Sequence, residues 1–161
     1  MICAIISDKS ELCSVCKNEY ENPFALIKDN LTELIWEYHR KGATEFYINC
    51  EYGIPLWAGE TICSMKKHLD ITLSIILPCE EQCRNWSEEQ RDRYYAVNRQ
   101  CDYASMVRCA EAEEGCELAE KMMIDSADTV IIYAKSPEST HAYRYALENE
   151  KNIVTPELDL P

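Results

Sequence analysis

Three hydroxyl side chains precede a predicted helix near the end of the chain and form one candidate site. Ser136, Ser139 and Thr140 stand between a short apolar run and the amphipathic segment 140–150. Hydroxyls, together with the backbone N–H groups of a helix's first turn, can hold an anion such as phosphate. The alternative is that Thr140 only caps the helix, and Glu138 in the same loop opposes phosphate binding.

Basic and sulfur side chains offer two further kinds of chemistry. Lys9, Arg108 and Lys135 each follow a predicted strand closely and would point toward the same sheet edge, where they could neutralise a phosphate together. The alternative is that they are solvated surface charges.

The Cys13–Cys16 pair is a CxxC motif, but it lies in a predicted loop, and the second pair, Cys79 and Cys83, enters a helical segment. We therefore predict reduced thiols and no metal site.

Short apolar runs alternate along the chain with longer amphipathic segments. The predicted strands cover residues 1–6, 45–49, 71–77, 103–107, 129–133 and 152–154; the predicted helices cover 23–41, 55–65, 88–101, 113–126 and 140–150. Helix starts are marked by Pro23, by Pro55 and by a capping box from Ser87 to Gln90. This alternation predicts an α/β, Rossmann-like, doubly wound and mainly parallel sheet of about five to six strands, with helices on both faces.

Composition limits the classes of function. The chain has 161 residues and a net charge of −13, which predicts one domain spanning residues 1–161 and argues against binding to nucleic acid. It has four glycines, against about eleven at average usage. The chain therefore has few glycines from which to build a loop that binds a pyrophosphate. The apolar run 1–6 is too short for a signal sequence and no run would cross a membrane, which predicts a cytoplasmic protein.

Sequence motifs of several enzyme classes are missing. The chain contains no G-x-S-x-G elbow, no Walker A loop and no G-x-G-x-x-G fingerprint. We therefore expect neither a serine hydrolase, a P-loop NTPase nor a dehydrogenase, and no bound cofactor.

Longer motifs carry a resemblance to a known family. The run Pro78-Cys-Glu-Glu-Gln-Cys-Arg-Asn-Trp-Ser-Glu and the run Gly53-Ile-Pro-Leu-Trp-Ala-Gly-Glu resemble the YpsA-like family of the SLOG superfamily, as do Gly115-Cys-Glu-Leu and the segment 123–133. The resemblance covers nearly the whole chain. It implies a Rossmannoid fold and, by kinship with cytokinin-activating phosphoribohydrolases and the DNA-processing protein DprA, a nucleotide-derived ligand.

The chain departs from the family pattern in the loops where a ligand would lie. Ser7 stands in place of a glycine, whereas Lys9 keeps a basic position. The family's S-G after the second strand is Asn49-Cys50 here, and the segment 136–140 lacks the two glycines that relatives often carry. The resemblance therefore implies a degenerate phosphate loop.

The resemblance also supplies candidate roles for single residues. Glu60 matches the W-A-x-E segment and is the candidate general acid or base, since a glutamate positions water against an N-glycosidic bond in phosphoribohydrolase relatives. Side-chain chemistry rather than the resemblance suggests Glu80 as the second acid. Trp57 could stack on a base, and the alternative is that its ring packs in the core. The full set of expected ligand-binding residues is Ser7, Lys9, Cys50, Gly53, Trp57, Glu80, Arg108, Lys135, Ser136, Ser139 and Thr140.

Three functions follow from these observations. The leading prediction is binding or sensing of a nucleotide-derived small molecule. The first alternative is hydrolysis of a nucleoside monophosphate by Glu60, and the second is a non-catalytic protein-interaction module that has lost the pocket. A homodimer is an expected assembly because homo-oligomers are common in related folds.

Overall fold

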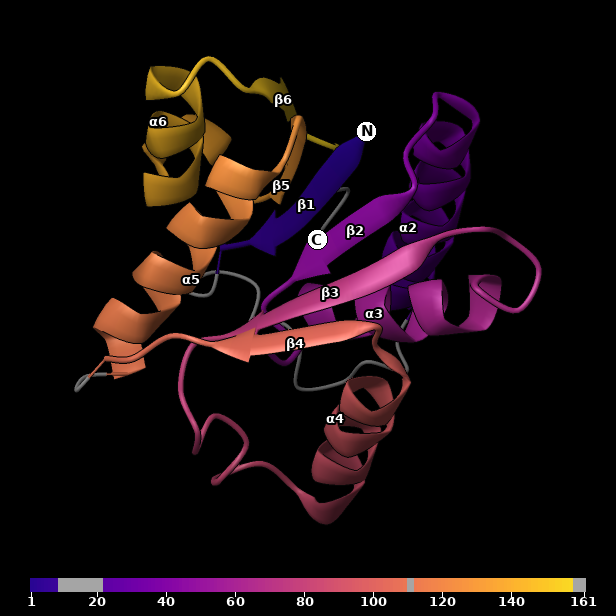
Figure 1. Cartoon of the computed structure of the whole chain (residues 1–161), viewed down its shortest axis with the longest axis vertical. Helices are drawn as coiled ribbons and strands as arrows, with labels where there is room; N and C mark the ends of the chain where they lie inside the picture. The colour runs from indigo at the N-terminus through magenta and orange to yellow at the C-terminus, as the bar shows by residue number, and fades with distance from the viewer. Residues whose placement is uncertain (9–21, 110–111, 158–161) are drawn as a thin grey trace.

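The computed structural model describes residues 1–8, 22–109 and 112–157, which form a parallel sheet with helices on both faces (Figure 1). The elements are β1 (Ile2–Ser7), α2 (Asn22–Arg40), β2 (Glu45–Ile48), α3 (Ile54–Met65), β3 (Thr72–Leu77), α4 (Glu88–Gln100), β4 (Tyr103–Met106), α5 (Ala112–Ser126), β5 (Thr129–Tyr133), the 3-10 helix η2 (Pro137–Ser139), α6 (His141–Glu148) and β6 (Asn152–Val154). The predicted Rossmann-like α/β class is confirmed.

Strand order explains how the helices divide between the two faces. The six strands lie in the order β4-β3-β2-β1-β5-β6, and every neighbouring pair is parallel. The chain steps outward in one direction from β1 to β4 and then returns to β5 on the other side of β1. Because crossovers are right-handed, this reversal places α2, α3 and α4 on one face and α5 and α6 on the other (Figure 1).

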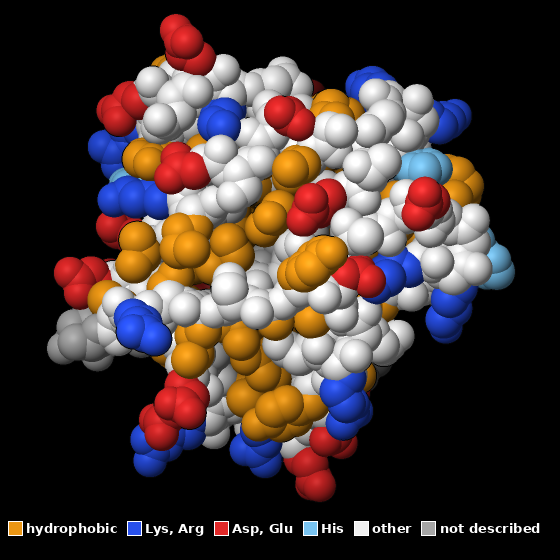
Figure 2. Space-filling model, viewed as in Figure 1, with side chains coloured by type: hydrophobic (Ala, Val, Ile, Leu, Met, Phe, Trp, Pro, Cys, Tyr) orange, Lys and Arg blue, Asp and Glu red, His pale blue; other side chains and the backbone are white. Residues whose placement is uncertain are grey.

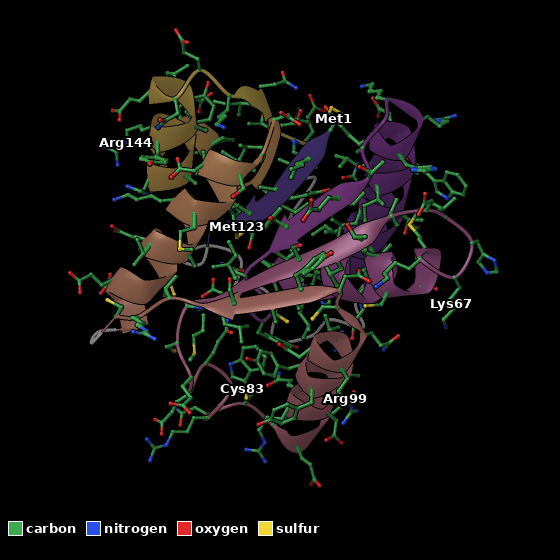
Figure 3. The ribbon with its side chains drawn as sticks, in the orientation of Figure 1. Met1, Lys67, Cys83, Arg99, Met123 and Arg144 are labelled. Carbon is green, nitrogen blue, oxygen red and sulfur yellow. The ribbon has the colours of Figure 1, made fainter. Side chains whose placement is uncertain are left out.

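Each face has its own apolar core. Buried side chains of α2 and α3 meet those of β2 and β3 on one face, with Phe24, Phe46 and Trp57 among the largest. On the other face, α5 and α6 bury smaller side chains against β1 and β5. Met123 of α5, labelled in Figure 3, is fully buried there. The apolar periodicity of the helices therefore faces the sheet, as the sequence predicts.

Local signals in the sequence set several helix boundaries. Ser87 and Gln90 form the predicted capping box at the start of α4: the Gln90 N–H donates to the Ser87 hydroxyl, and the Ser87 N–H donates to the Gln90 side chain. Pro55 lies in the first turn of α3. Gly42 follows the end of α2 with a φ of 97°, a conformation that glycine adopts without steric cost.

The edge strand β4 is exposed along its whole length. Tyr103 is 67% exposed and Met106 is 47% exposed. Figure 2 shows apolar side chains gathered across the middle of this side of the molecule, in the part of the view where Figure 1 has β3 and β4.

Candidate functional site

The reversal of strand order lies between β1 and β5. The chain leaves β1 toward α2 on one face, while α6 follows β5 on the opposite face. The helices that follow the two strands, α2 and α6, therefore lie on opposite faces, which makes the carboxyl ends of β1 and β5 a topological switch point. In open parallel sheets this is where ligands bind.

A cavity of about 390 Å³ occupies that position on the α5 and α6 face of the sheet. Its volume lies within the range of roughly 300–1,000 Å³ that small-molecule pockets have. The end of β1, one residue of β5, one side of α5 and the start of α6 line it. The lining residues are Ile6, Ser7, Asp8, Glu113, Cys116, Glu117, Glu120, Ile132, Ser139, Thr140, His141 and Ala142.

Acidic side chains dominate the charge of this cavity. Glu113, Glu117 and Glu120 recur at positions i, i+4 and i+7 of α5, so they lie on one side of that helix. Asp8 contributes a carboxylate from the other wall, and its backbone N–H donates to the Tyr133 carbonyl at 3.0 Å. Among the described residues that line the cavity, none is a lysine or an arginine. The described part of the wall therefore carries four acidic side chains and no lysine or arginine.

The hydroxyls near the start of α6 make local hydrogen bonds. Thr140 caps α6: its Oγ1 accepts from the Tyr143 N–H at 3.1 Å and donates to the Pro137 carbonyl at 2.7 Å. The Ser139 hydroxyl donates to the Ser136 carbonyl at 2.7 Å. Thr140 is therefore the N-cap residue of α6. The backbone N–H groups of a helix's first turn have no partner within the helix, and His141 and Ala142 bring that turn to the cavity.

His141 is the one imidazole among the described cavity residues. Its ring stacks on Tyr145 with 6.0 Å between centroids and 18° between planes. Its Nδ1 atom is buried and has no hydrogen-bond partner within the described part of the chain. An unsatisfied buried polar atom is costly to the folded state.

A polar chain of contacts extends from the cavity toward β2 and β3. The Cys116 thiol, which lines the cavity, donates to Glu51 Oε1 at 3.2 Å. The Glu51 N–H in turn donates to Asn49 Oδ1, and Gln82 Nε2 donates to the Asn49 carbonyl. Asn49 is fully buried, yet its Nδ2 has no partner among the described residues. The buried amide donor is therefore a second unsatisfied group at the carboxyl edge of the sheet.

The predicted basic residues are not gathered at one point. Arg108 and Lys135 are both exposed and follow β4 and β5. Three strands lie between β4 and β5, so their ends are about 19 Å apart at the usual strand spacing. Lys9 lies outside the described residues. The structure does not bring Arg108 and Lys135 to a common phosphate.

Glu60 lies on α3, on the opposite face from the cavity. Its carboxylate makes two hydrogen bonds with the Arg93 guanidinium, from Nε at 2.6 Å and from Nη2 at 2.8 Å. It is not among the residues that line the cavity. Glu80 is exposed in the turn segment after β3. The two candidate acids are therefore not brought together at the cavity.

The remaining predicted residues lie around the start of α3. Cys50 is fully buried with a φ of 57°, and burial raises the pKa of its thiol. Gly53 precedes α3 with a φ of 103°. The Trp57 ring is 1% exposed and packs edge-on against Phe24. These three positions shape the α3 side of the core, while Ser7, Ser139 and Thr140 reach the cavity.

Thiols lie at several places in the described chain. Cys83, labelled in Figure 3, is buried near the aromatic side chains beside α4 and contacts the Tyr95 hydroxyl at 3.7 Å. Cys13 and Cys16 lie outside the described residues. Within residues 1–8, 22–109 and 112–157, no three His, Cys, Asp or Glu side chains are grouped so that they could hold a metal ion.

Most of the acidic wall was not predicted from the sequence. Asp8 directly follows the first strand, so the rule that selected Ser7 and Lys9 could have found it. The spacing of Glu113, Glu117 and Glu120 showed that they share one side of a helix, but only the tertiary structure shows which side faces the cavity.

The fold and the cavity define a Rossmann-like α/β protein with an acidic cavity at its topological switch point. Within the described ranges, no helix has both the length and the apolar character needed to cross a bilayer. The YpsA family model, described as the YspA SLOG family, matches residues 9–155, and the chain belongs to this family.

Individual relatives are similar over most of the chain. A UPF0398 protein of Macrococcus caseolyticus is 26% identical over 136 residues, which cover 79% of this chain and 74% of that protein. The UPF0398 protein YpsA of Bacillus subtilis is 26% identical over 124 residues, which cover 75% of this chain and 68% of that protein. A UPF0398 protein of Listeria innocua is 28% identical over 122 residues, which cover 74% of this chain and 65% of that protein.

Proposed function

We propose that this protein binds a nucleotide-derived small molecule in the cavity at the carboxyl ends of β1 and β5. The position of the cavity carries the proposal, because it lies where the strand order reverses and has the size of a ligand pocket. Membership of the SLOG family supports the same ligand class through the resemblance to nucleotide-processing relatives.

Polar side chains along the wall also support the proposal. Ser7, Ser139 and Thr140 line the cavity, and their hydroxyl oxygens can accept hydrogen bonds from a polar ligand. Hydrolysis is not part of this proposal, because Glu60 is paired with Arg93 and does not line the cavity.

A thermal-shift screen tests the proposal. Adenosine, AMP, ADP-ribose, NAD and cyclic dinucleotides are added separately to the reduced protein. A ligand at about 100 times its dissociation constant adds about 2.7 kcal/mol to the free energy of unfolding. For a chain of this size that corresponds to a rise of roughly 5–10 °C in melting temperature. A cooperative melt that none of these compounds shifts would contradict the proposal.

A pair of variants locates the site. Ser139→Trp places a bulky ring at the cavity wall, where Ser139 is exposed. Glu138→Trp places the same ring one residue earlier in η2, at an exposed position that does not line the cavity. We expect Ser139→Trp to abolish the ligand-induced shift and Glu138→Trp to keep it. Equal shifts in both variants would place the ligand elsewhere.

A further inference from the structure

We infer that the edge strand β4 pairs with β4 of a second copy of this chain, in an antiparallel register centred on Ser105. The pairing joins the sheets of the two copies into one continuous sheet about a two-fold axis. The inference goes beyond the proposed function, because it concerns assembly and depends on no residue of the cavity.

The outer edge of β4 presents free backbone groups. The Val107 N–H donates to the Leu77 carbonyl of β3 at 3.0 Å, in the register that β4 keeps along its length. Backbone groups of successive strand residues point to opposite sides, so Ser105 points toward β3 as Val107 does. The N–H and C=O groups of Ala104 and Met106 therefore point outward, where no other strand of the described chain lies.

The usual protection of an edge strand is missing from β4 in the described chain. All four of its residues are exposed, on both faces of the strand, so no described helix covers it. A groove of about 460 Å³ is lined in part by Tyr103, Ala104 and Ser105, so space remains beside the strand. Residues 103–107 include no charge and no proline, which natural proteins use to keep edge strands from pairing. A second strand can therefore reach the outward backbone groups (Figure 1).

The sequence of this edge is complementary to itself, which favours a second copy as the partner. An antiparallel register centred on Ser105 sets Ala104 of one copy opposite Met106 of the other. The outward groups of these residues then exchange N–H···O bonds at two symmetric places. The same register, continued past the strand, sets the exposed Arg108 opposite Asp102, so a base meets an acid twice across the axis.

The charges also select this register over its neighbours. A slip of two residues in either direction preserves the outward hydrogen bonds but sets Arg108 opposite Gln100 or Ala104, which carry no charge. Asp102 has room for the second base, because Lys66 and the Leu73 N–H both donate to its Oδ2. Its side chain is 31% exposed, and a carboxylate accepts several hydrogen bonds.

Two properties of the chain limit the strength of the dimer. Each copy carries a net charge of −13, so long-range repulsion opposes association. The pairing of two short strands also buries less than the roughly 1,600 Å² of a standard interface. We therefore expect a reversible dimer with a dissociation constant of about 10–100 μM at about 150 mM NaCl.

Sedimentation velocity of the full, reduced chain from about 5 μM to about 500 μM tests the inference over this range. We expect a monomer that converts to a dimer as concentration rises. Ser105→Lys should abolish the dimer, because two lysines then meet on the axis, whereas Leu147→Lys at an exposed position of α6 should keep it. A monomer at every concentration, an assembly larger than a dimer, or an equal effect of both variants would overturn the inference.

A charge reversal at the end of the edge tests the register. Arg108→Glu sets an acid opposite Asp102, and we expect it to weaken the dimer at least about tenfold. Arg40→Glu makes the same change of net charge at an exposed position at the end of α2, far along the chain from β4. It should weaken the dimer less than about threefold, by long-range repulsion alone. Equal weakening by the two variants would be evidence against the Ser105-centred pairing.

A disulfide across the axis gives a second test of the register. Facing residues that do not exchange hydrogen bonds have Cα atoms about 4.5 Å apart, within the range of about 4.4–6.8 Å that disulfides span. We expect mild oxidation of Ser105→Cys to link the two introduced thiols, as shown by mass spectrometry of the linked peptides. Ser126→Cys, at an exposed position of α5, is the control and should give no such link. Absence of the link in Ser105→Cys, or its equal formation in the control, would overturn the inference.

Discussion

At the scale of single residues, a side-chain partner decides what a motif glutamate can do. Glu60 lies in a segment that the family resemblance associates with a catalytic acid or base. In the structure both of its oxygens are bonded to Arg93, and the pair joins α3 to α4. A paired carboxylate of this kind contributes to packing between helices.

The Glu60–Arg93 pair should stabilise the protein measurably. A double-mutant cycle with Glu60→Ala and Arg93→Ala is expected to give a coupling energy of about 1–2 kcal/mol in urea unfolding, because the pair is bidentate and partly buried. The Arg84–Glu81 pair serves as the control, since its side chains are 71% and 68% exposed. Its coupling should stay below about 0.5 kcal/mol. Equal couplings would contradict the expected role of burial.

At the scale of elements, close backbone contact explains a glycine of the family-like motif. An added Cβ at Gly115 of α5 would lie 2.2 Å from the Pro78 carbonyl oxygen, beyond the end of β3. Gly59 of α3 is also crowded, but by the tips of Ile48 and Val97 at 2.7 and 2.8 Å. Both glycines allow helices to approach the sheet, and packing accounts for them without a ligand.

Gly115→Ala is therefore expected to destabilise the protein by about 1–3 kcal/mol. In an unobstructed helix interior the same change stabilises the protein by up to about 1 kcal/mol. The sign of the change in the free energy of unfolding therefore distinguishes a crowded position from an open one. Gly59→Ala is the comparison variant. It should lose less stability than Gly115→Ala, because the side-chain tips that crowd Gly59 move more easily than backbone atoms. Urea unfolding measures both. A Gly115→Ala protein as stable as the wild type would contradict the observed approach of α5 to Pro78.

One carboxylate links three elements near the amino ends of the strands. Asp102 accepts from Lys66 beside α3 and from the Leu73 N–H of β3, and it immediately precedes β4. Burial alone would raise the pKa of this carboxyl, but the hydrogen bonds from Lys66 and Leu73 outweigh it and hold the pKa below its usual value. The charged form is therefore favoured by folding.

Stability should depend on pH through Asp102. The pKa of Asp102 is lower in the folded state than in the unfolded state. Its contribution to the free energy of unfolding is therefore complete above the unfolded-state pKa of about 4 and is lost as pH falls through the folded-state pKa. We expect Asp102→Asn to lose about 1–2 kcal/mol at pH 7 and to show a shallower decline below about pH 5. Urea unfolding from pH 7 to pH 2 measures this. Parallel stability curves for the two proteins would be the contrary result.

At the scale of the whole molecule, the net charge of −13 opposes the compact state. We expect raising NaCl from about 20 mM to about 300 mM to increase the melting temperature by about 2–5 °C, because salt screens this repulsion. A Glu33→Lys, Glu148→Lys variant makes the charge less negative at two exposed positions and should respond less. A melting temperature that falls with salt in the wild type would show that surface ion pairs outweigh the repulsion.

The elements of this fold were predictable because their signals are local. Apolar spacing placed all six strands and five helices of the described chain close to their observed bounds. The Ser87–Gln90 capping box and the Pro55 helix start depend on neighbours within one turn. Alternation of strands and helices then implied a parallel sheet covered on both faces.

The site was only partly predictable because it depends on distant parts of the chain. The sequence by itself determined that Ser7 and Thr140 lie at the carboxyl edge of a parallel sheet, and their strand-end and helix-start positions were sufficient for that. Only the tertiary structure decided which strands are neighbours. The return of β5 beside β1 brings the α5 glutamates and His141 to Ser7 and leaves Arg108 three strands away. Strand order is set by packing of the whole core, which no local spacing encodes.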